Sequence, residues 1–288
     1  MDGIINIYKP VGMTSHDVVN KVRRIAGTKK VGHTGTLDPD AEGVLPVCIN
    51  RGTKVADMLT FSDKRYTATF KLGIITDTLD ISGTVLEERP VNVTKQQIVD
   101  SIKSFVGTIE QIPPMYSAIK VDGRKLCDLA RKGIEVERKS RTVEIYEINV
   151  LDVKENSFTI DVKCSKGTYI RTLGNDIGEK LGCGAVMTSL VRTQSSIFKI
   201  RDSVKLEDLT PENYEKYVTL AVDLFDGEKI IVDNSILSKV LNGNAIPYDG
   251  IEGAYYKLYD SDGRLLSLSK MEDGMLKVEI MFCVGEQQ

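Results

Sequence analysis

The chain has 288 residues, of which 41% are hydrophobic, enough to bury the core of one large domain with a smaller one beside it. No run approaches the roughly 18 apolar residues of a membrane helix, and the N-terminus does not begin like a secretion signal. The five cysteines are scattered and never spaced as CxxC, which argues against a disulfide framework or a zinc cluster. We therefore expect a cytoplasmic protein without membrane contact.

The charge is unevenly distributed along the chain. The formal net charge is -3, but residues 1–201 carry 30 Lys and Arg against 24 Asp and Glu, whereas residues 202–288 carry 8 against 17. A uniformly basic nucleic-acid binder is excluded. The net positive N-terminal two-thirds can still bind a polyanion, and we do not expect the acidic C-terminal part to dominate the binding of that polyanion.

The first elements are a strand, a helix and a loop. "GIINIYKP" is a strand-like run, and "TSHDVVNKVRRIAG" begins with a Thr/Ser start signal and places Val18, Val22 and Ile25 on one helical face. The loop "GHTGTLDPDAEGVLP", residues 32–46, follows this helix and leads into the apolar run "VLPVCI". It gathers three glycines, three carboxylates and one of the chain's two histidines.

The middle of the chain predicts further strands and helices. "KRYTATFKLG" alternates like a half-buried strand, and "TKQQIVDSIKSFVG" is a helix with a capping box at Thr94 and Gln97. "RTVEIYEINVLDV" and "SFTIDVKCSKGTYIRTLG" predict two neighbouring strands, and "NDIGEKLG" a short helix. These elements indicate an α+β fold, with a mixed, largely antiparallel sheet decorated by helices.

Two further segments stand apart. From Lys229 the chain offers short strands separated by Asp/Gly turns, which predicts a small β-rich domain over 229–288 after a larger domain over 1–228. Residues 113–141 form a basic insertion, with 8 basic and 4 acidic residues from Lys120 to Arg141. A clamp on a nucleic-acid backbone and a charged surface helix with Leu126 and Leu129 packed inward fit this pattern equally well.

The crowded loop is a poor match to metal and nucleotide sites. Asp38, Asp40, Glu42 and Gly43 stand at positions 1, 3, 5 and 6 of an EF-hand loop, but position 12 is Ile49, so calcium is rejected. The loop lacks the GK[ST] of a phosphate-binding P-loop. A hydrolase using His33 and Asp38 is a weak alternative, since the chain has no GxSxG elbow. Two interpretations remain: Asp38 is a reactive carboxylate presented from an irregular backbone, or Asp38 and His33 are turn and capping residues, which is the commoner role of an Asp-Pro pair.

Four segments, taken in order, carry a family resemblance. "KPVGMTSHDVV", "GHTGTLDPDAEGVLPV", "DKRYTATFKLGIITDTLD" and "CSKGTYIRTLGNDIGEKLG" closely resemble the bacterial tRNA pseudouridine synthases of the TruB family, over most of residues 3–193. The resemblance implies the pseudouridine synthase fold, with 113–141 as a thumb-like insertion and 229–288 as a PUA-like RNA-binding domain. It implies conversion of uridine 55 in the T-loop of tRNA to pseudouridine, with no metal or other cofactor.

The resemblance also assigns roles to individual residues. Asp38 is the catalytic aspartate, Arg171 the cation that keeps it charged, and Asp80 a cleft aspartate that bonds to the arginine. Tyr66 stacks on the target base and helps to move a proton. Without the resemblance, Arg171 is most simply a surface salt-bridge residue and Tyr66 a core tyrosine.

The remaining assignments concern RNA and the active-site loop. His33 fills the space left by the flipped base, Tyr169 packs in the same pocket, and Lys9 supports the active-site loop. Lys166 and Leu190 complete the expected substrate-binding set. On residue type alone, His33 would be a turn residue and Lys9 an exposed lysine.

Three functions remain open at this point: a synthase acting on the T-arm of tRNA, a catalytically silent tRNA-binding protein or chaperone on the same scaffold, and the hydrolase. We expect no obligate protein partner and a monomer. One departure from the family pattern is visible, because "LVRTQSS", residues 190–196, replaces L-R-R-T-R-x-G. A peripheral RNA-contacting arginine and a glycine are missing there.

Overall fold

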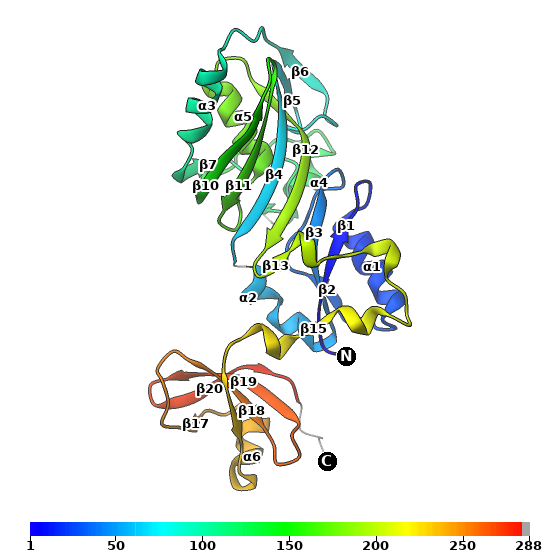
Figure 1. Ribbon diagram of the computed structural model, residues 1–288, viewed down its shortest axis with the longest axis vertical. Coiled ribbons are helices and arrows are strands. Elements are labelled where there is room, and N and C mark those ends of the chain that lie inside the picture. Colours follow the sequence, from blue (N-terminus) through cyan, green and yellow to red (C-terminus); the bar gives the residue numbers. More distant parts are fainter. Residues whose placement is uncertain (61, 122, 284–288) are drawn as a thin grey trace.

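The computed structural model describes residues 1–60, 62–121 and 123–283 (Figure 1). Its main feature is a long sheet in the order β14-β1-β3-β12-β4-β11-β10-β7, joined at its margins by β2, β13 and β15. The strands of this sheet are β1 (Gly3–Lys9), β2 (Val31–His33), β3 (Glu42–Ile49), β4 (Lys64–Leu72), β7 (Gly107–Gln111), β10 (Arg141–Val153), β11 (Ser157–Cys164), β12 (Ala185–Ser195), β13 (Phe198–Lys199), β14 (Val204–Lys205) and β15 (Val218–Leu220).

Helices cover the sheet in two places. The α-helices are α1 (Ser15–Ile25), α2 (Ala56–Thr60), α3 (Lys95–Lys103), α4 (Leu126–Ala130), α5 (Ile170–Lys180) and α6 (Asn234–Leu241). The 3-10 helices are η1 (Asn50–Val55), η2 (Ile200–Asp202), η3 (Leu206–Asp208), η4 (Tyr214–Tyr217) and η5 (Ala221–Leu224). The capping box predicted at Thr94 and Gln97 is present at the start of α3, and Thr14 and Asp17 form another on α1. Among the described residues, no helix is both long and apolar enough to cross a membrane.

The expectation of a mixed, largely antiparallel sheet is confirmed. Most neighbouring strands run antiparallel, whereas β1 pairs with β14 and β3 with β12 in parallel. The β3–β12 contact pairs Val191 with Glu42 and Arg192 with Gly43. Gly43 has a φ of 104°, and a Cβ there would lie 2.3 Å from the Arg192 carbonyl oxygen, so only glycine permits this approach.

Two hydrophobic clusters flank this junction. On one side, Phe70, Phe158 and Leu173 belong to a buried cluster that packs α3 and α5 against β4, β10 and β11. On the other side, Val18 and Val22 of α1 pack against β1 and β3, as their spacing predicted. The sheet therefore consists of two halves, each with its own core, that meet where β3 pairs with β12.

The strand predicted over residues 157–174 is wrong in its second half. Strand β11 ends at Cys164, the chain turns at Gly167 with a φ of 80°, and α5 begins at Ile170. The apolar residues of this region lie at helical spacing, with Ile170, Leu173 and Ile177 buried against the sheet. Arg171 therefore lies in the first turn of a helix, and the helix starts five residues before the predicted one.

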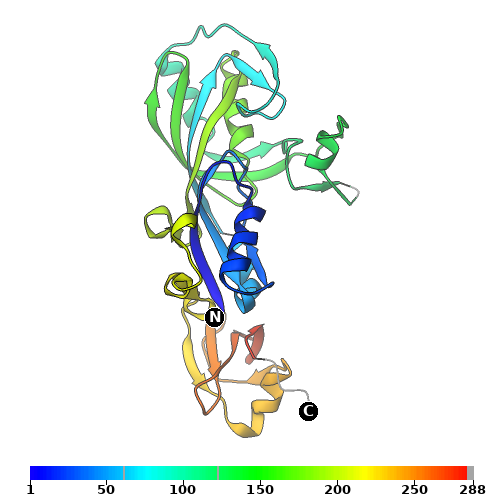
Figure 2. The same cartoon turned by 90° about the vertical axis from the view of Figure 1, so that its right-hand side faces the viewer.

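Residues 113–141 project from the body of the molecule between β7 and β10, as Figure 2 shows. They contain a short hairpin, β8 (Lys120–Val121) with β9 (Arg124–Lys125), followed by α4. Met115, Leu126 and Leu129 form a small buried cluster of their own. The inward packing of the two leucines is thus confirmed, while the basic side chains of this segment remain available.

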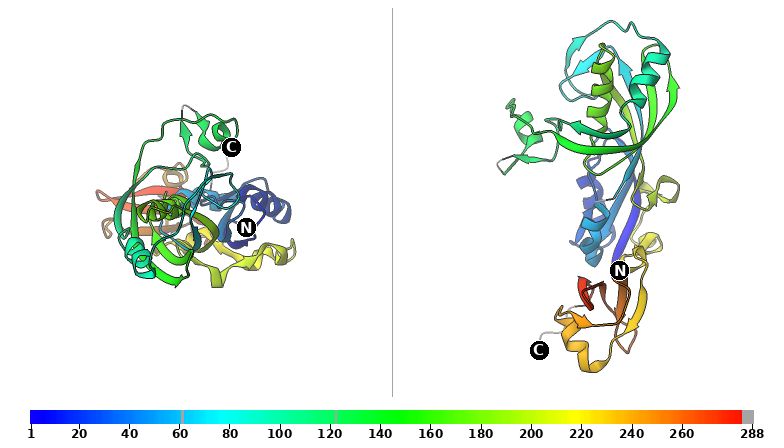
Figure 3. Two further views of the ribbon diagram at one scale, coloured as in Figure 1. Left: turned by 90° about the horizontal axis from the view of Figure 1, so that it is seen from above. Right: turned by 90° about the vertical axis from the view of Figure 1, so that its left-hand side faces the viewer.

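The C-terminal part contains a separate sheet in the order β16-β18-β19-β20-β17. Its strands are β16 (Glu228–Ile231), β17 (Ile246–Pro247), β18 (Tyr255–Tyr259), β19 (Leu265–Glu272) and β20 (Met275–Met281). Sequence analysis missed α6, whose N-cap Asp233 accepts a hydrogen bond from the Ser235 amide. The right panel of Figure 3 shows this sheet set apart from the main one. Leu268 and Phe282 belong to the same buried cluster as Ile4 and Val55 of the main body. A small hairpin of β5 (Ile74–Thr76) and β6 (Val85–Glu88) lies at the opposite end of the molecule.

Candidate active site

The loop between β2 and β3 carries Asp38, and buried cations hold its backbone. The Nζ of Lys9 donates hydrogen bonds to the carbonyl oxygens of Ala41 at 2.6 Å, Pro10 at 2.9 Å and Pro39 at 3.2 Å. The Lys9 side chain is fully buried, and burial lowers its pKa to about 8. The exposed position expected from residue type alone is therefore wrong. Lys9 is buried, and its hydrogen bonds support the backbone of the loop, as the family resemblance implies.

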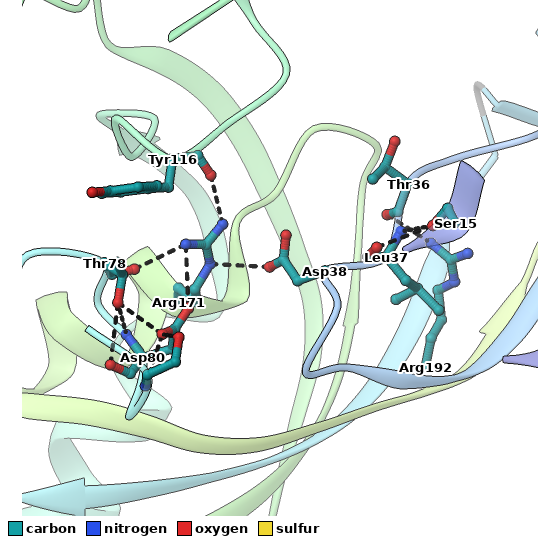
Figure 4. A network of polar contacts seen from close by, with 10 residues as sticks. Ser15, Thr36, Leu37, Asp38, Thr78, Asp80, Tyr116, Arg171 and Arg192 are labelled. Carbon is teal, nitrogen blue, oxygen red and sulfur yellow. Dashed lines mark hydrogen bonds and ion pairs between the residues drawn. The ribbon is translucent and has the colours of Figure 1, made fainter. Parts of the chain in front are cut away.

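Arg192 holds the first half of the same loop from β12. It is 1% exposed, its Nε donates to the Val44 carbonyl at 2.7 Å, and its Nη atoms donate to the carbonyls of Gly35 and Thr36 at 3.1 and 3.4 Å. Between the two cations, the hydroxyl of Ser15 accepts from the Leu37 amide at 2.8 Å and donates to the Leu37 carbonyl at 3.0 Å. The loop is thus fixed on both sides of Asp38 by groups outside it. Figure 4 shows Ser15 and Arg192 beside the part of the loop that precedes Asp38.

Asp38 projects from this loop toward Arg171, as Figure 4 shows. The Nε of Arg171 lies 3.1 Å from Oδ2 of Asp38, and the arginine side chain is 6% exposed while that of the aspartate is 38% exposed. The arginine thus lies behind the carboxylate, and one carboxylate oxygen remains open to a bound molecule. Burial raises the pKa of Asp38, although Arg171 acts in the opposite direction.

Three further contacts fix the guanidinium of Arg171. Its Nη1 donates to the Thr78 carbonyl at 2.9 Å and lies 3.4 Å from Oδ2 of Asp80, and its Nη2 donates to the Tyr116 carbonyl at 2.7 Å. The other oxygen of Asp80 accepts from the hydroxyls of Thr78 and Ser82. Asp80 is thus in contact with the arginine, on the side away from Asp38.

A cavity of about 520 Å³ opens in front of this pair, within the range of small-ligand sites. Six of the nine residues singled out in the sequence line it: Asp38, Tyr66, Lys166, Tyr169, Arg171 and Leu190. Burial raises the pKa values of Tyr66 and Tyr169, which keeps both phenols neutral. The cavity therefore offers two aromatic rings and an apolar side chain around one carboxylate, a surface suited to a flat, uncharged ring.

Three predicted residues lie outside the cavity lining. Lys9 lies beneath the loop, and Asp80 lies behind Arg171. His33 ends β2, and its Nδ1 accepts a hydrogen bond from the Gly35 amide at 3.2 Å. Burial lowers the pKa of His33, which favours the neutral ring. In this arrangement His33 acts as a turn residue beside the loop, and its placement against RNA stays a prediction.

Sequence reasoning missed several residues of the site. Arg192 lies in the stretch noted only for its departure from the family pattern, and Lys64 and Tyr116 also line the cavity. The pairing of β4 with β12 would have indicated Arg192 and Lys64, had it been known. Arg192 lies opposite Tyr66, and Lys64 lies two residues before Tyr66 on the same face of β4. Among the described residues, no three His, Cys, Asp or Glu side chains gather as a metal site.

Comparison with known proteins agrees with this geometry. The family model described as "TruB family pseudouridylate synthase (N terminal domain)" matches residues 23–170, and "tRNA pseudouridylate synthase B C-terminal domain" matches residues 171–224. The chain is 46% identical over 289 residues to tRNA pseudouridine synthase B of Clostridium kluyveri, covering 98% of this chain and 100% of that protein. It is 50% identical over 248 residues to the protein of the same name from Alkaliphilus oremlandii, covering 85% and 83%.

Solved structures show the same fold. A Cbf5-Nop10-Gar1 complex contains a chain with a TM-score of 0.70 and 30% identity, covering 98% of this chain and 85% of that one. The archaeal box H/ACA sRNP Nop10-Cbf5 complex gives a TM-score of 0.69 at 28% identity, with coverage of 99% and 87%. The matched domains include the Asp38 loop, the cavity and α5. The chain belongs to the TruB family of pseudouridylate synthases and is an isomerase that converts uridine to pseudouridine in RNA.

Proposed function

We propose that this chain converts uridine 55 in the T-loop of tRNA to pseudouridine in the cytoplasm, with Asp38 as the catalytic residue. The observation that carries this proposal is the carboxylate of Asp38, paired with the buried Arg171 at a cavity lined by Tyr66 and Tyr169. The names of the curated relatives, tRNA pseudouridine synthase B, support a tRNA substrate.

The reaction needs no electron or group donor, so the chain's own residues suffice for it. The bond between C1′ of the ribose and N1 of uracil breaks, the base turns, and a bond forms from C1′ to C5. The C5 proton then leaves and N1 takes up a proton, so the product is an isomer of the substrate. An ionised Asp38 supports this sequence by covalent attack or by stabilising a cation that develops at the ribose. Arg171 favours the ionised form by lying 3.1 Å from the carboxylate.

The target nucleotide has to leave its folded loop before it can reach Asp38. Unstacking costs roughly a few kcal/mol, which contacts in the cavity have to offset. Tyr66, Tyr169 and Leu190 supply flat and apolar surface for the extruded base. The buried contacts of Lys9, Ser15 and Arg192 hold the loop in place beforehand, so little ordering of this loop is needed on binding.

The projecting segment 113–141 is proposed to close over the T-arm. Most of its basic side chains are exposed around a small core, and its Tyr116 carbonyl accepts a hydrogen bond from Arg171 at 2.7 Å. A movement of this segment on RNA binding would therefore reach the catalytic pair directly. For the β-rich sheet of residues 228–281 we propose an RNA-binding role as a PUA-like domain.

The test is chemical mapping of pseudouridine in unmodified tRNA treated with the protein. Asp38→Ala is expected to abolish product while the Kd for a T-arm RNA changes by less than about tenfold, or 1.4 kcal/mol. Asp40→Ala is the matched control, because Asp40 is an exposed carboxylate two residues along the same loop. Full activity in Asp38→Ala would refute the mechanism. Tight binding by the wild-type protein without product would favour a silent RNA-binding protein.

A further inference from the structure

Lys64 is a buried cation at the cavity to which the proposed chemistry assigns no task. It is the first residue of β4, it is 7% exposed, and it lines the cavity together with Thr60 and Lys166. Two residues along the strand, on the same face, lies Tyr66. A nucleotide whose base rests on Tyr66 therefore places its own backbone within reach of the lysine side chain.

The ammonium group of Lys64 is held by main-chain oxygens. Its Nζ donates to the Thr60 carbonyl at 2.6 Å and to the Ser62 carbonyl at 2.5 Å. Its neighbour in sequence, Asp63, is paired instead with Lys163 at 3.4 Å. Within the described residues, no carboxylate forms an ion pair with Lys64. An ammonium has three N–H donors, so one remains for a further acceptor.

The surroundings of Lys64 make its charge costly in the free protein. Burial lowers its pKa to about 8, and the neighbouring charges of Arg192 and Lys166 act in the same direction, whereas the charge of Asp63 acts in the opposite direction. Arg192 is itself buried, and its hydrogen bonds to carbonyl oxygens bring it no counter-charge. A buried positive group beside other positive groups is stabilised when an anion enters the site.

We propose that Lys64 binds a backbone phosphate adjacent to the extruded nucleotide and thereby positions that nucleotide over Asp38. This inference rests on the proposed function, because it takes the RNA strand as the source of the anion. The phosphate supplies the counter-charge for the cations at this end of the cavity and accepts the third N–H of Lys64. Lys64 is a positioning residue, since the reacting atoms lie at Asp38.

A purely structural role for Lys64 predicts different behaviour. Its two carbonyl partners lie at and just beyond the end of α2, where a cation stabilises the last turn of a helix. If that were its whole contribution, replacing Lys64 would lower stability and weaken every RNA equally. A phosphate contact instead makes the effect of the lysine depend on the charge of one linkage in the RNA.

The experiment measures Kd for a T-arm stem-loop RNA and for three versions that each carry one neutral methylphosphonate linkage, at the phosphates flanking the target uridine and the next one along the strand. In the wild-type protein, one neutral linkage is expected to weaken binding by at least about tenfold, as for a close charge pair. In Lys64→Met, the same linkage is expected to cost less than about twofold. Lys64→Arg, which keeps the charge, is expected to restore part of the sensitivity.

Lys163→Met serves as the control, because Lys163 is partly exposed, pairs with Asp63 and does not line the cavity. Its replacement is expected to leave the effect of every neutral linkage unchanged. Equal effects of all three linkages in the wild-type and Lys64→Met proteins would overturn the proposal, whatever the stability of the variant. Pseudouridine formation on the unmodified RNA, measured in parallel, tests the proposed function separately, because Kd alone decides the role of Lys64.

Discussion

A single side chain, Arg171, joins three parts of the chain that lie far apart in sequence. It contacts Asp38 on the loop before β3, the turn at Thr78 and Asp80, and the Tyr116 carbonyl in the projecting segment. Only a planar group with several N–H donors in fixed directions can make all of these contacts at once. The orientation of the Asp38 carboxylate therefore depends on the shape of the guanidinium as well as on its charge.

Replacing Arg171 with lysine tests this dependence. We expect Arg171→Lys to lower kcat/KM by about 100-fold, because a lysine keeps the charge but not the directed contacts that orient Asp38. We also expect the acid limb of activity to move to higher pH. Burial already raises the pKa of Asp38 and Arg171 opposes that rise, so weaker opposition leaves the carboxyl protonated up to a higher pH.

A pH profile of single-turnover rates checks both expectations. Arg89→Lys is the control, since Arg89 forms ion pairs with Glu87 and Glu179 outside the cavity lining. Near-normal turnover in Arg171→Lys, with an unchanged acid limb, would show that charge alone is enough.

At the scale of single residues, the sequence predicted the site residues that belong to recognisable motifs and missed those whose only distinguishing property is burial. Asp38 and its pairing with Arg171 were expected from the family motifs, and the structure brings the two together. Lys64 and Arg192 were not expected, because lysine and arginine are ordinarily exposed and nothing in the local sequence marks these two as buried. Burial is a property of the tertiary arrangement, so it became visible only with the register of β4 and β12.

Among the elements, the placement of α5 decides where the arginine lies. The helix passes so close to the sheet that a Cβ at Gly174 would lie 1.9 Å from the Phe70 ring. This close approach, one turn after Arg171, sets the start of the helix next to the Asp38 loop. The strand predicted here runs on past Cys164, although Ser165 and Gly167 are turn-forming residues and the chain does turn at Gly167.

The projecting segment 113–141 carries a prediction of its own. If it grips phosphates, the double variant Arg124→Gln/Lys125→Gln is expected to weaken T-arm binding and to reduce the slope of log Kd against log salt by up to about 1 for each phosphate that is no longer bound. Both residues are exposed on β9. Titrations at several salt concentrations provide the measurement, with Lys154→Gln in the exposed turn between β10 and β11 as control. An unchanged slope of log Kd against log salt would show that this hairpin does not contact RNA phosphates.

At the scale of the molecule, the acidic C-terminal part is joined to the main body through apolar contacts. Leu268 and Ile280 of the small sheet belong to the same buried cluster as Ile4, Cys48 and Val55. The sequence predicted four strands of this sheet, β16, β18, β19 and β20, from their turn signals and missed β17. It could not predict which apolar residues face the partner domain, because both faces of β19 are buried.

This joint cluster predicts that stability is shared between the two parts. Leu268→Ala removes a side chain with 0% exposure, so we expect a decrease of about 2–5 kcal/mol in the free energy of unfolding and a lower Tm for the whole chain. Ile251→Ala is the control, since Ile251 is 75% exposed. Thermal unfolding followed by circular dichroism and by calorimetry checks this. A Tm unchanged in Leu268→Ala would mean that the cluster contributes little.

The contacts of Arg192 also bear on the order in which the chain acquires its site during synthesis. Arg192 follows Thr36, whose carbonyl it binds, by 156 residues. A ribosome that has already delivered Asp38 must therefore add most of the main sheet before the loop meets its partner, and domains generally fold as units. The Asp38 loop is among the first segments made and among the last to reach its final conformation, so a chain truncated before β12 would lack the contacts that hold this loop.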